Sequence, residues 1–455
     1  MYGFKLPEDF LIGTANSAFQ SEGAWDKDGK SQSWVEYYAK LKAGATTRLG
    51  MAYTNEPPDR GCFFYDNYEA YIEDMQKTGQ NTYRMSLAWP RIIPEGYGEV
   101  NQKAIDHYNK VIDKLLSCGI TPFVDLYHWD LPQCLNEQGG FTNPQFPEWF
   151  EAYAKVCFAA FGDRVKLWST FNEPQVALHN GYCSGTFPPY HTDMAEYLQA
   201  AQNCLIAHFR AVRQMRQIVP DGKIGIVNAI LSVSPIDFTQ MDVYACELHM
   251  NHYVGWWTEP LIEGTYPRVM LRENTDLAAN MPQGYQDELD QWFTPMDFVG
   301  LNYYMSKRTR YDPDANFHFK RVESFYAAPG QAFAPYPPGL FDVVQYVSNR
   351  YHGIDIYITE NGCALPNLYD EEKECDDEER VTYLREHLRM CARLIRAGYT
   401  NLKGYYYWND ADSYEQSRGY DLRFGLTWVD HKTGKRRWKK SRYYFSEVCK
   451  SKMVN

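Results

Sequence analysis

The strongest constraint on the fold is a regular alternation of short apolar runs with amphipathic segments along the chain. The apolar runs are too short for helices and rich in β-branched and aromatic residues, which is typical of buried parallel strands. Strands are expected at 10–13, 81–87, 120–127, 165–171, 223–228, 298–301, 354–359 and 402–408. Between the runs, apolar residues recur at helical spacing, and several of these segments end at a glycine. Helices are expected at 62–78, 104–118, 146–161, 195–219, 238–253, 340–351, 378–397 and 441–450.

This alternation implies a parallel sheet with right-handed crossover connections. About eight strand–helix units in one chain favour a closed barrel over an open sheet. No linker or shift in composition divides the sequence, so we predict an α/β fold, a single (β/α)8 TIM barrel domain over residues 1–455. Two long segments, 43–61 and about 305–338, are expected to be loops that wall the carboxyl-end face, because long loops in a compact domain are usually functional.

Composition excludes several classes of function. A formal net charge of −12 argues against nucleic-acid binding, which needs a basic surface. No window approaches the ~20 apolar residues of a membrane-spanning helix, and the first residues lack the apolar core of a secretion signal. The 11 cysteines are scattered without CxxC pairs, which favours reduced thiols and a cytoplasmic protein. No metal-ligand spacing or phosphate-binding glycine motif occurs, so we expect neither a metal nor a cofactor. A homo-oligomer is left open.

Two of the predicted strands lead into a glutamate. Glu173 follows the strand at 165–171, and Glu360 follows the strand at 354–359, which the turn Asn361-Gly362 ends. A carboxylate at the end of a buried strand costs free energy unless it is paired, although either glutamate alone could be a solvated loop acid. Two such strands can place two carboxylates across one cleft. Hydrolysis of a glycosidic bond needs this pair, one carboxyl protonated and the other ionised.

The two glutamates are predicted to differ in protonation. Arg84, in the strand at 81–87, is expected beside Glu360, where its positive charge favours the ionised carboxylate. Glu173 has no cation near it in the sequence, so burial and repulsion from the other carboxylate should raise its pKa. If the reaction retains configuration, the two carboxyl groups should lie roughly 5–5.5 Å apart.

Further polar or aromatic residues follow nearly every predicted strand. On a barrel these positions converge on the carboxyl-end face, where active sites lie. One such residue would mean little, but this many are hard to explain as core packing. Besides the two glutamates, the set comprises Gln20, Arg84, His128, Asn172, Asn302, Tyr304, Trp408 and Glu415.

Several short motifs carry a resemblance to a known family. They are FLIGTANSAFQSEGAW at 10–25, RMSLAWPRIIPEG at 84–96, HWDLP at 128–132, TFNEP at 170–174, GLNYY at 300–304, YITENG at 357–362 and RFGL at 423–426. With these motifs the chain resembles glycoside hydrolase family 1, the β-glucosidase and β-galactosidase family, along nearly its full length. TFNEP and ITENG at these relative places are very specific together.

The resemblance implies a retaining double-displacement mechanism on a small-molecule β-glycoside, without a cofactor. Glu173 would be the general acid and then the base, and Glu360 the nucleophile that forms the glycosyl-enzyme. Arg84 and Tyr304 would hydrogen-bond Glu360, and Asn172 would hold the sugar 2-hydroxyl. The other implied sugar-binding residues are Gln20, His128, Trp129, Asn302 and Glu415, with Trp408, joined to Asn409 by a cis peptide, as the floor beneath the ring.

The chain departs from the family at Gln416, where a second tryptophan usually donates to a sugar hydroxyl. Glutamine is smaller and can both donate and accept, so Gln416 is either neutral drift or a change in the preferred glycone. Arg418 could meet an anionic sugar, although an exposed surface arginine is the simpler interpretation. Phe333 corresponds to the family's aglycone tryptophan and favours a hydrophobic or aryl aglycone.

A second departure concerns phosphorylated sugars. The phospho-glycosidase branch of the family places Ser, Lys and Tyr where this chain has Glu415, Leu422 and Phe424. Without that cation and those hydroxyls a 6-phosphate would lose its partners, which argues against phosphorylated substrates.

The leading hypothesis is a retaining β-glycosidase that hydrolyses terminal non-reducing β-D-glucosyl residues, with galactosyl or fucosyl residues as further candidates. One alternative is a β-glycosidase retuned by Gln416 for another or modified glycone, for example an anionic one. Another is a catalytically silent sugar-binding barrel, which the loss of either glutamate would favour; both are present. A transglycosidase on the same scaffold is the third.

Overall fold

The computed structural model of the chain describes residues 4–42, 56–322, 335–416 and 418–455. At its centre, strands pair in the order β6-β5-β4-β3-β2-β11-β9-β7, and pairing of β6 with β7 closes the ring. The barrel strands run parallel and comprise β2 (Leu11–Ala15), β3 (Thr82–Ser86), β4 (Thr121–Tyr127), β5 (Leu167–Asn172), β6 (Lys223–Pro235), β7 (Phe298–Tyr311), β9 (Asp355–Asn361) and β11 (Leu402–Trp408). The predicted TIM barrel is confirmed.

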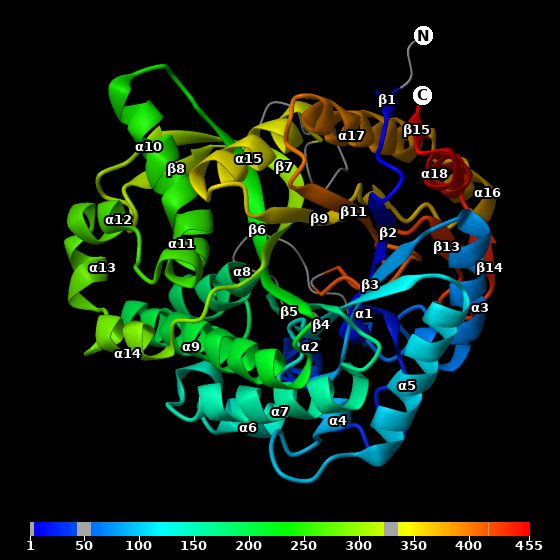
Figure 1. Cartoon of the computed structure of the whole chain (residues 1–455), viewed down its shortest axis with the longest axis horizontal. Helices are drawn as coiled ribbons and strands as arrows, with labels where there is room; N and C mark the ends of the chain where they lie inside the picture. Colours follow the sequence, from blue (N-terminus) through cyan, green and yellow to red (C-terminus); the bar gives the residue numbers. More distant parts are fainter. Residues whose placement is uncertain (1–3, 43–55, 323–334, 417) are drawn as a thin grey trace.

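Helices surround the barrel (Figure 1). The eight that the sequence predicted are α3 (Phe64–Thr78), α5 (Gln102–Ser117), α7 (Phe146–Phe161), α9 (Met194–Ile218), α10 (Gln240–Met250), α15 (Pro337–Arg350), α17 (Glu378–Arg396) and α18 (Lys440–Ser451). In α5, steps of three and four place one face against the barrel, formed by the buried Ala104, Ile105, Tyr108, Val111, Ile112 and Leu115. Gly119, at a φ of +72°, follows the end of this helix.

Shorter elements fill the connections. The short helices include α1 (Ala18–Ser21), α2 (Trp34–Lys42), α4 (Trp89–Ile92), α6 (Gln133–Glu137), the 3-10 turn Gly140–Thr142, α8 (Pro174–Leu178), the π-helical turns His179–Cys183 and Asn251–Gly255, and α16 (Glu371–Cys375). The short strands include β1 (Phe4–Lys5), β8 (Phe319–Val322), β10 (Leu365–Pro366), β12 (Leu422–Arg423), β13 (Thr427–Val429), β14 (Arg436–Trp438) and β15 (Met453–Val454). β1 pairs with β15, which places the two ends of the chain side by side (Figure 1).

The segment at 305–338 differs from the prediction of a long loop. β7 continues to Tyr311 and pairs with the antiparallel β8, and β6 continues beside it to Pro235. The two strands were predicted to end at Leu301 and Asn228, because polar residues interrupt their apolar runs there. Pairing of the two extensions with each other satisfies backbone groups that a loop would leave to solvent. Residues 43–55 and 323–334 of the two predicted loops lie outside the described residues.

Four helices between β6 and β7 were not predicted. They are α11 (Trp256–Glu263), α12 (Arg268–Glu273), α13 (Thr275–Ala279) and α14 (Tyr285–Trp292). Each is short, and Gly264, Pro267 and Pro282 interrupt the apolar pattern between them, so no long helical period is visible in the sequence.

The barrel interior is filled rather than open. A layer of apolar residues lies beneath the polar strand ends, formed by Phe123, Leu167, Phe298, Tyr357 and Tyr406. The rings of Phe123 and Phe298 meet edge to face with centroids 5.5 Å apart. This layer closes the barrel from below, so the polar residues above it face only the carboxyl-end opening.

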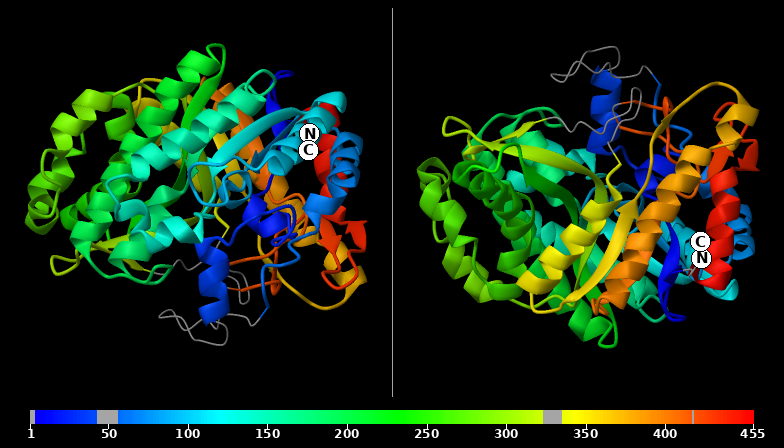
Figure 2. Two further views of the ribbon diagram at one scale, coloured as in Figure 1. Left: turned by 90° about the horizontal axis from the view of Figure 1, so that it is seen from below. Right: turned by 90° about the horizontal axis from the view of Figure 1, so that it is seen from above.

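The helix α2 marks that carboxyl-end side. The N–H of Trp34 donates to the Leu131 carbonyl, in the segment that follows β4 (2.8 Å). Figure 2 shows α2 projecting from the body of the molecule. No helix within the described ranges has the length and apolar character needed to cross a membrane.

Candidate active site

The two predicted glutamates lie at the carboxyl ends of barrel strands. Glu173 directly follows β5 and precedes Pro174 at the start of α8, and Glu360 is the last residue but one of β9. Glu173 has a φ of +49°, in the left-handed region that few residues other than glycine adopt. Its N–H donates to the Val227 carbonyl of β6 (2.8 Å), which anchors the strained junction. Strain held in this way is typical of functional positions.

Glu360 is buried, with 4% of its surface exposed, and is held by two donors. Its Oε1 accepts a hydrogen bond from Nη1 of Arg84 (2.7 Å), and its Oε2 accepts one from the hydroxyl of Tyr304 (2.6 Å). Burial and then the negative charge of Glu360 raise the pKa of Tyr304 well above its usual value, so the phenol stays a donor. The structure thus places Arg84 and Tyr304 on the two oxygens of Glu360, where they orient the carboxylate.

Glu173 has a different environment. Its Oε1 accepts a hydrogen bond from the Asn302 amide (3.0 Å), and it forms no ion pair within the described ranges. Burial, followed by the negative charge of Glu360, raises its pKa to about 8, although Asn302 and the more distant Arg84 act in the opposite direction. At neutral pH this side chain is therefore mostly a protonated acid.

Two amide side chains connect the glutamates. Oδ1 of Asn172 accepts from Nη2 of Arg84 (2.6 Å) and from Nδ2 of Asn302 (3.0 Å). Oδ1 of Asn302 accepts from the Thr359 hydroxyl (2.7 Å), which leaves its amide group for Asn172 and Glu173. One continuous network thus runs from Glu360 through Arg84, Asn172 and Asn302 to Glu173.

Other predicted residues lie around this network. Asn172 donates to Nε2 of His128 (3.1 Å), and the His128 ring stacks on Trp408 with centroids 5.5 Å apart. The Trp408–Asn409 peptide is cis, as the resemblance implied. Gln20 donates to the Tyr414 carbonyl (2.8 Å).

One prediction changes in detail at Trp129. Its indole N–H donates to the backbone carbonyl of Asn172 (2.9 Å). Because an indole has a single donor, Trp129 has none left for a sugar hydroxyl. In this structure Trp129 therefore positions Asn172.

The residues after β11 form the other side of the site. Burial raises the pKa of Glu415 to about 8, while a hydrogen bond from Trp408 acts in the opposite direction. Oε1 of Glu415 and Oε1 of Gln416 are both buried and have no hydrogen-bond partner within the described ranges. Two polar oxygens therefore remain for the hydroxyls of a ligand.

Leu422 and Phe424 lie in an apolar cluster with Trp408. Neither carries the positive charge or hydroxyl that would hold a phosphate. Phe333, the predicted aglycone residue, lies outside the described residues.

Sequence reasoning missed three polar residues of the interior. Asp125 in β4 forms an ion pair with Arg84 and accepts a hydrogen bond from the Ser169 hydroxyl, and Thr359 orients Asn302. A signal for Asp125 was present, since an acid inside the apolar run Phe123-Val124-Asp125-Leu126-Tyr127 requires a buried partner.

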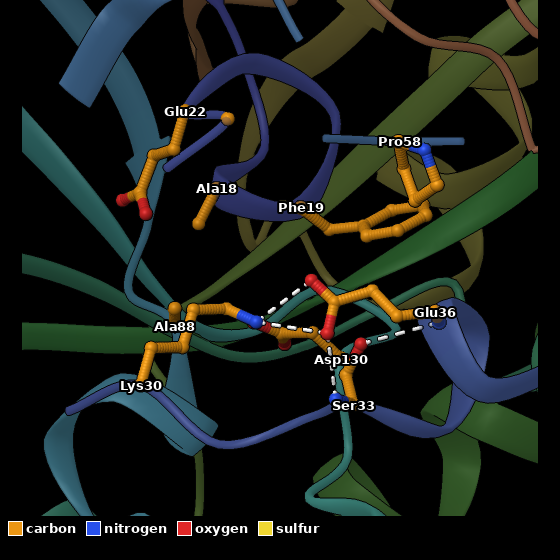
Figure 3. Close-up of a pocket in the computed structure, with 10 residues that line it drawn as sticks. Ala18, Phe19, Glu22, Lys30, Ser33, Glu36, Pro58, Ala88 and Asp130 are labelled. Carbon is orange, nitrogen blue, oxygen red and sulfur yellow. Dashed lines mark hydrogen bonds and ion pairs between the residues drawn. The ribbon is translucent and has the colours of Figure 1, made fainter. Parts of the chain in front are cut away.

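A separate polar cavity is lined by Lys30, Ser33, Glu36 and Asp130, among others (Figure 3). The Lys30 amine points at the Glu36 carboxylate (2.7 Å), and the N–H of Ser33 donates to the same carboxylate (2.7 Å). Burial raises the pKa of the neighbouring Asp130 well above its usual value. The cavity has about 10 Å³ of free space, room for one water and far too little for a sugar ring. No group of three or more His, Cys, Asp or Glu side chains in the described part of the chain is arranged to hold a metal ion.

Comparisons with known proteins place this geometry among the glycosidases. The profile of glycosyl hydrolase family 1 matches residues 3–454. A β-glucosidase A of Thermotoga maritima is 37% identical over 448 residues, with 98% of each chain covered. A 6-phospho-β-glucosidase of Bacillus subtilis is 34% identical over 466 residues, also with 98% of each covered. The solved structure of the β-glucosidase from Thermotoga maritima in complex with glucoimidazole superposes with a TM-score of 0.91 at 37% identity, covering 98% of this chain and 99% of that one.

Proposed function

The chain belongs to glycosyl hydrolase family 1 and is a retaining β-glycosidase of the β-glucosidase type, and from this premise we propose that Glu173 and Glu360 are its catalytic pair. The observation that carries the proposal is the contrast between the two carboxyl groups. Glu360 accepts hydrogen bonds from an arginine and a tyrosine, whereas Glu173 meets one neutral amide and has a pKa of about 8. In such a pair, Glu360 can act as the nucleophile and Glu173 as the acid at neutral pH.

The first step forms a glycosyl-enzyme. Glu360 attacks the anomeric carbon, the glycosidic C–O bond breaks, and Glu173 gives its proton to the departing oxygen. In the second step Glu173, now ionised, takes a proton from water while the water oxygen attacks the anomeric carbon and Glu360 leaves. The proton returns to Glu173, and two inversions retain the configuration.

We place the glycone between the Asn172 side and the Glu415 side of the site. Asn172 and His128 would bind the hydroxyl next to the anomeric carbon, and Trp408 would lie beneath the ring. The oxygens of Glu415 and Gln416 that have no partner among the described residues would meet hydroxyls at the far end. A β-D-glucosyl residue fits this set, and galactosyl or fucosyl residues differ from it only at that far end.

The proposal excludes 6-phosphorylated glycones. Leu422 and Phe424 are packed against Trp408, so a phosphate near them would be desolvated without a cation. We further propose a cytoplasmic enzyme, supported by 11 cysteines that are all unpaired.

Initial rates on matched p-nitrophenyl glycosides test the glycone assignment. The set is the β-glucoside, β-galactoside, β-fucoside, β-xyloside and β-glucuronide, measured with wild type and Gln416→Trp. We expect wild type to prefer the β-glucoside, and the substitution to change that rate less than severalfold. Poor glucoside turnover that Gln416→Trp restores would show a retuned glycone pocket, and preference for the glucuronide would point to an anionic glycone.

A second measurement tests the catalytic pair itself. A slow 2-fluoro glucoside with a good leaving group should accumulate the glycosyl-enzyme, and peptide mass mapping should find the sugar on Glu360. Sugar binding without turnover or labelling would instead support a silent sugar-binding barrel.

A further inference from the structure

A third acid, Asp125, lies in the barrel interior beneath the two glutamates, and the chemistry above does not use it. Asp125 is fully buried in β4 and pairs in register with Ser169 of β5 and Ser86 of β3. Its Oδ1 accepts a hydrogen bond from the Ser169 hydroxyl, and its Oδ2 forms an ion pair with Nη2 of Arg84. It follows Phe123 by two residues, so it lies one layer above the apolar floor.

Arg84 is shared between this acid and the nucleophile. The guanidinium is fully buried, and its Nη1 donates to Glu360 (2.7 Å) and to the Thr359 carbonyl (3.2 Å). Its Nη2 donates to Asn172 (2.6 Å) and meets Asp125. One positive charge therefore faces two carboxylates from opposite edges of a rigid, planar group.

Burying a carboxylate is costly unless it is paired and hydrogen-bonded. Ser169 and Arg84 supply those contacts here, yet a neutral side chain in place of Asp125 would avoid the cost altogether. The cost of burying this acid suggests that it has a function, and its ion pair with Arg84 indicates that it acts through Arg84.

We propose that Asp125 is a positioning residue that fixes Arg84 between Glu360 and Asn172 and takes up part of its positive charge, so that Glu360 remains a strong nucleophile. The proposal rests on the function assigned above, because Glu360 must be the nucleophile for the effect to reach the rate. Without Asp125, the whole positive charge of Arg84 would act on Glu360. The carboxylate would be a weaker nucleophile, and the positive charge that develops on the sugar in the transition state would lose a nearby negative charge.

The negative charge of Asp125 also acts on the other titratable groups around Arg84. From β3, β4, β5, β7, β9 and β11 and the segments that follow them, the groups of this buried cluster are Arg84, Asp125, His128, Glu173, Tyr304, Glu360, Tyr406 and Glu415. Removing one negative charge from this buried cluster favours deprotonation of the acids that remain in it, so both limbs of the pH profile of kcat/KM should move to lower pH. A merely structural loss would lower activity without moving both limbs of the pH profile in one direction.

The experiment is the pH profile of kcat/KM on an aryl β-glucoside for wild type, Asp125→Asn and Ser169→Ala. Asp125→Asn keeps the shape and removes the charge; we expect kcat/KM to fall roughly tenfold to a hundredfold and both limbs to move to lower pH by about half a unit to one unit. Ser169→Ala is the matched control, since it removes a hydrogen bond to Asp125 and no charge. Its limbs should stay within about 0.2 units of wild type.

Exchanging the pair, Asp125→Ser with Ser169→Asp, returns the charge to the facing strand. We expect this double variant to bring both limbs back toward wild type, whereas Asp125→Ser alone does not. Unshifted limbs in a folded Asp125→Asn, checked by a cooperative thermal melt, would overturn the inference. If Asp125→Asn does not fold, the double variant provides the test. A double variant that melts at the wild-type temperature but has shifted limbs would also overturn the inference. Labelling of wild-type Glu360 by the 2-fluoro glucoside tests the proposed function separately, so the two failures are distinguishable.

Discussion

The two sides of the proposed catalytic site carry the same side chain in different electrostatic settings. On the β9 side, Glu360 accepts hydrogen bonds from Arg84 of β3 and Tyr304 of β7. On the β5 side, Glu173 has a neutral amide as its hydrogen-bond donor, at 3.0 Å, and a strained backbone that turns it into the cleft. One hydrogen-bond network spans both sides, but burial and the charge of Glu360 raise the pKa of Glu173, and the cation in that network, Arg84, contacts Glu360.

The comparison shows how a barrel divides two roles between identical residues. Strands distant in sequence bring the cation into contact with one carboxyl group and not with the other, and the negative charge of Glu360 disfavours ionisation of Glu173. Burial then holds Glu173 protonated to about pH 8. The difference between the two glutamates therefore depends on several strands of the barrel. Substitutions on the β5 side and on the β9 side should have distinguishable effects on activity.

Removing the nucleophile should have the largest effect. Glu360→Gln keeps the shape of the side chain but cannot form the glycosyl-enzyme, so we expect kcat on aryl β-glucosides to fall by on the order of 10⁵-fold or more. The measurement is steady-state turnover together with intact-protein mass after exposure to the 2-fluoro glucoside. Retained turnover, or retained labelling, would break the assignment of the β9 side.

Removing the acid should have a smaller effect that depends on the leaving group. Glu173→Gln should lower kcat/KM roughly 10²- to 10⁴-fold for a poor leaving group, and far less for dinitrophenolate, which needs no proton. Since the pKa of Glu173 is about 8, the alkaline limb of wild type should lie near that pH and should disappear in the variant.

Added azide provides the control for this variant. An anionic nucleophile needs no general base, so azide should speed breakdown of the glycosyl-enzyme in Glu173→Gln and yield the β-glucosyl azide. Equal losses for all leaving groups, with no response to azide, would contradict the role of the β5 side.

The residues at the strand ends of both sides could be predicted from the sequence, but the buried residues beneath them could not. Glu173, Glu360, Arg84 and Tyr304 were recognisable because strand ends converge on one face of a barrel. Asp125 carried a signal, an acid inside an apolar run, but its partner could not be predicted, because the direction in which a strand residue points depends on the pairing register.

The same limit applies to the extent of the strands. β6 and β7 were predicted to end at Asn228 and Leu301, but they continue to Pro235 and Tyr311. Their extensions are stabilised by pairing with each other, a contact between segments about 70 residues apart that local pattern does not contain.

Weakening the contact between Glu360 and its neutral donor should have a moderate effect. Tyr304→Phe removes one hydrogen bond to a charged acceptor, which is worth about 1.5–3 kcal/mol, so we expect kcat/KM to fall roughly tenfold to a hundredfold. The alkaline limb of the pH profile, set by Glu173, should move little, because Tyr304 donates to the other carboxyl group. A shift confined to the alkaline limb would show that the two sides are not separable.

The smallest predicted effect tests how the two sides are connected. The Thr359 hydroxyl donates to the Asn302 carbonyl oxygen (2.7 Å), and that bond turns the Asn302 amide toward Glu173. In Thr359→Val the amide loses its orientation, the ionised form of Glu173 loses an aligned donor, and its pKa should rise from about 8. Since Glu173 must be protonated to act as the acid, the alkaline limb of kcat/KM should move to higher pH by a few tenths of a unit, with a severalfold loss of rate. Thr170→Val is the matched control, because the Thr170 hydroxyl is equally buried but bonds His208 of α9 (2.7 Å), away from the cleft. A shift of the acid limb instead, or an equal shift in the control, would show that Thr359 acts through Glu360 or through general packing.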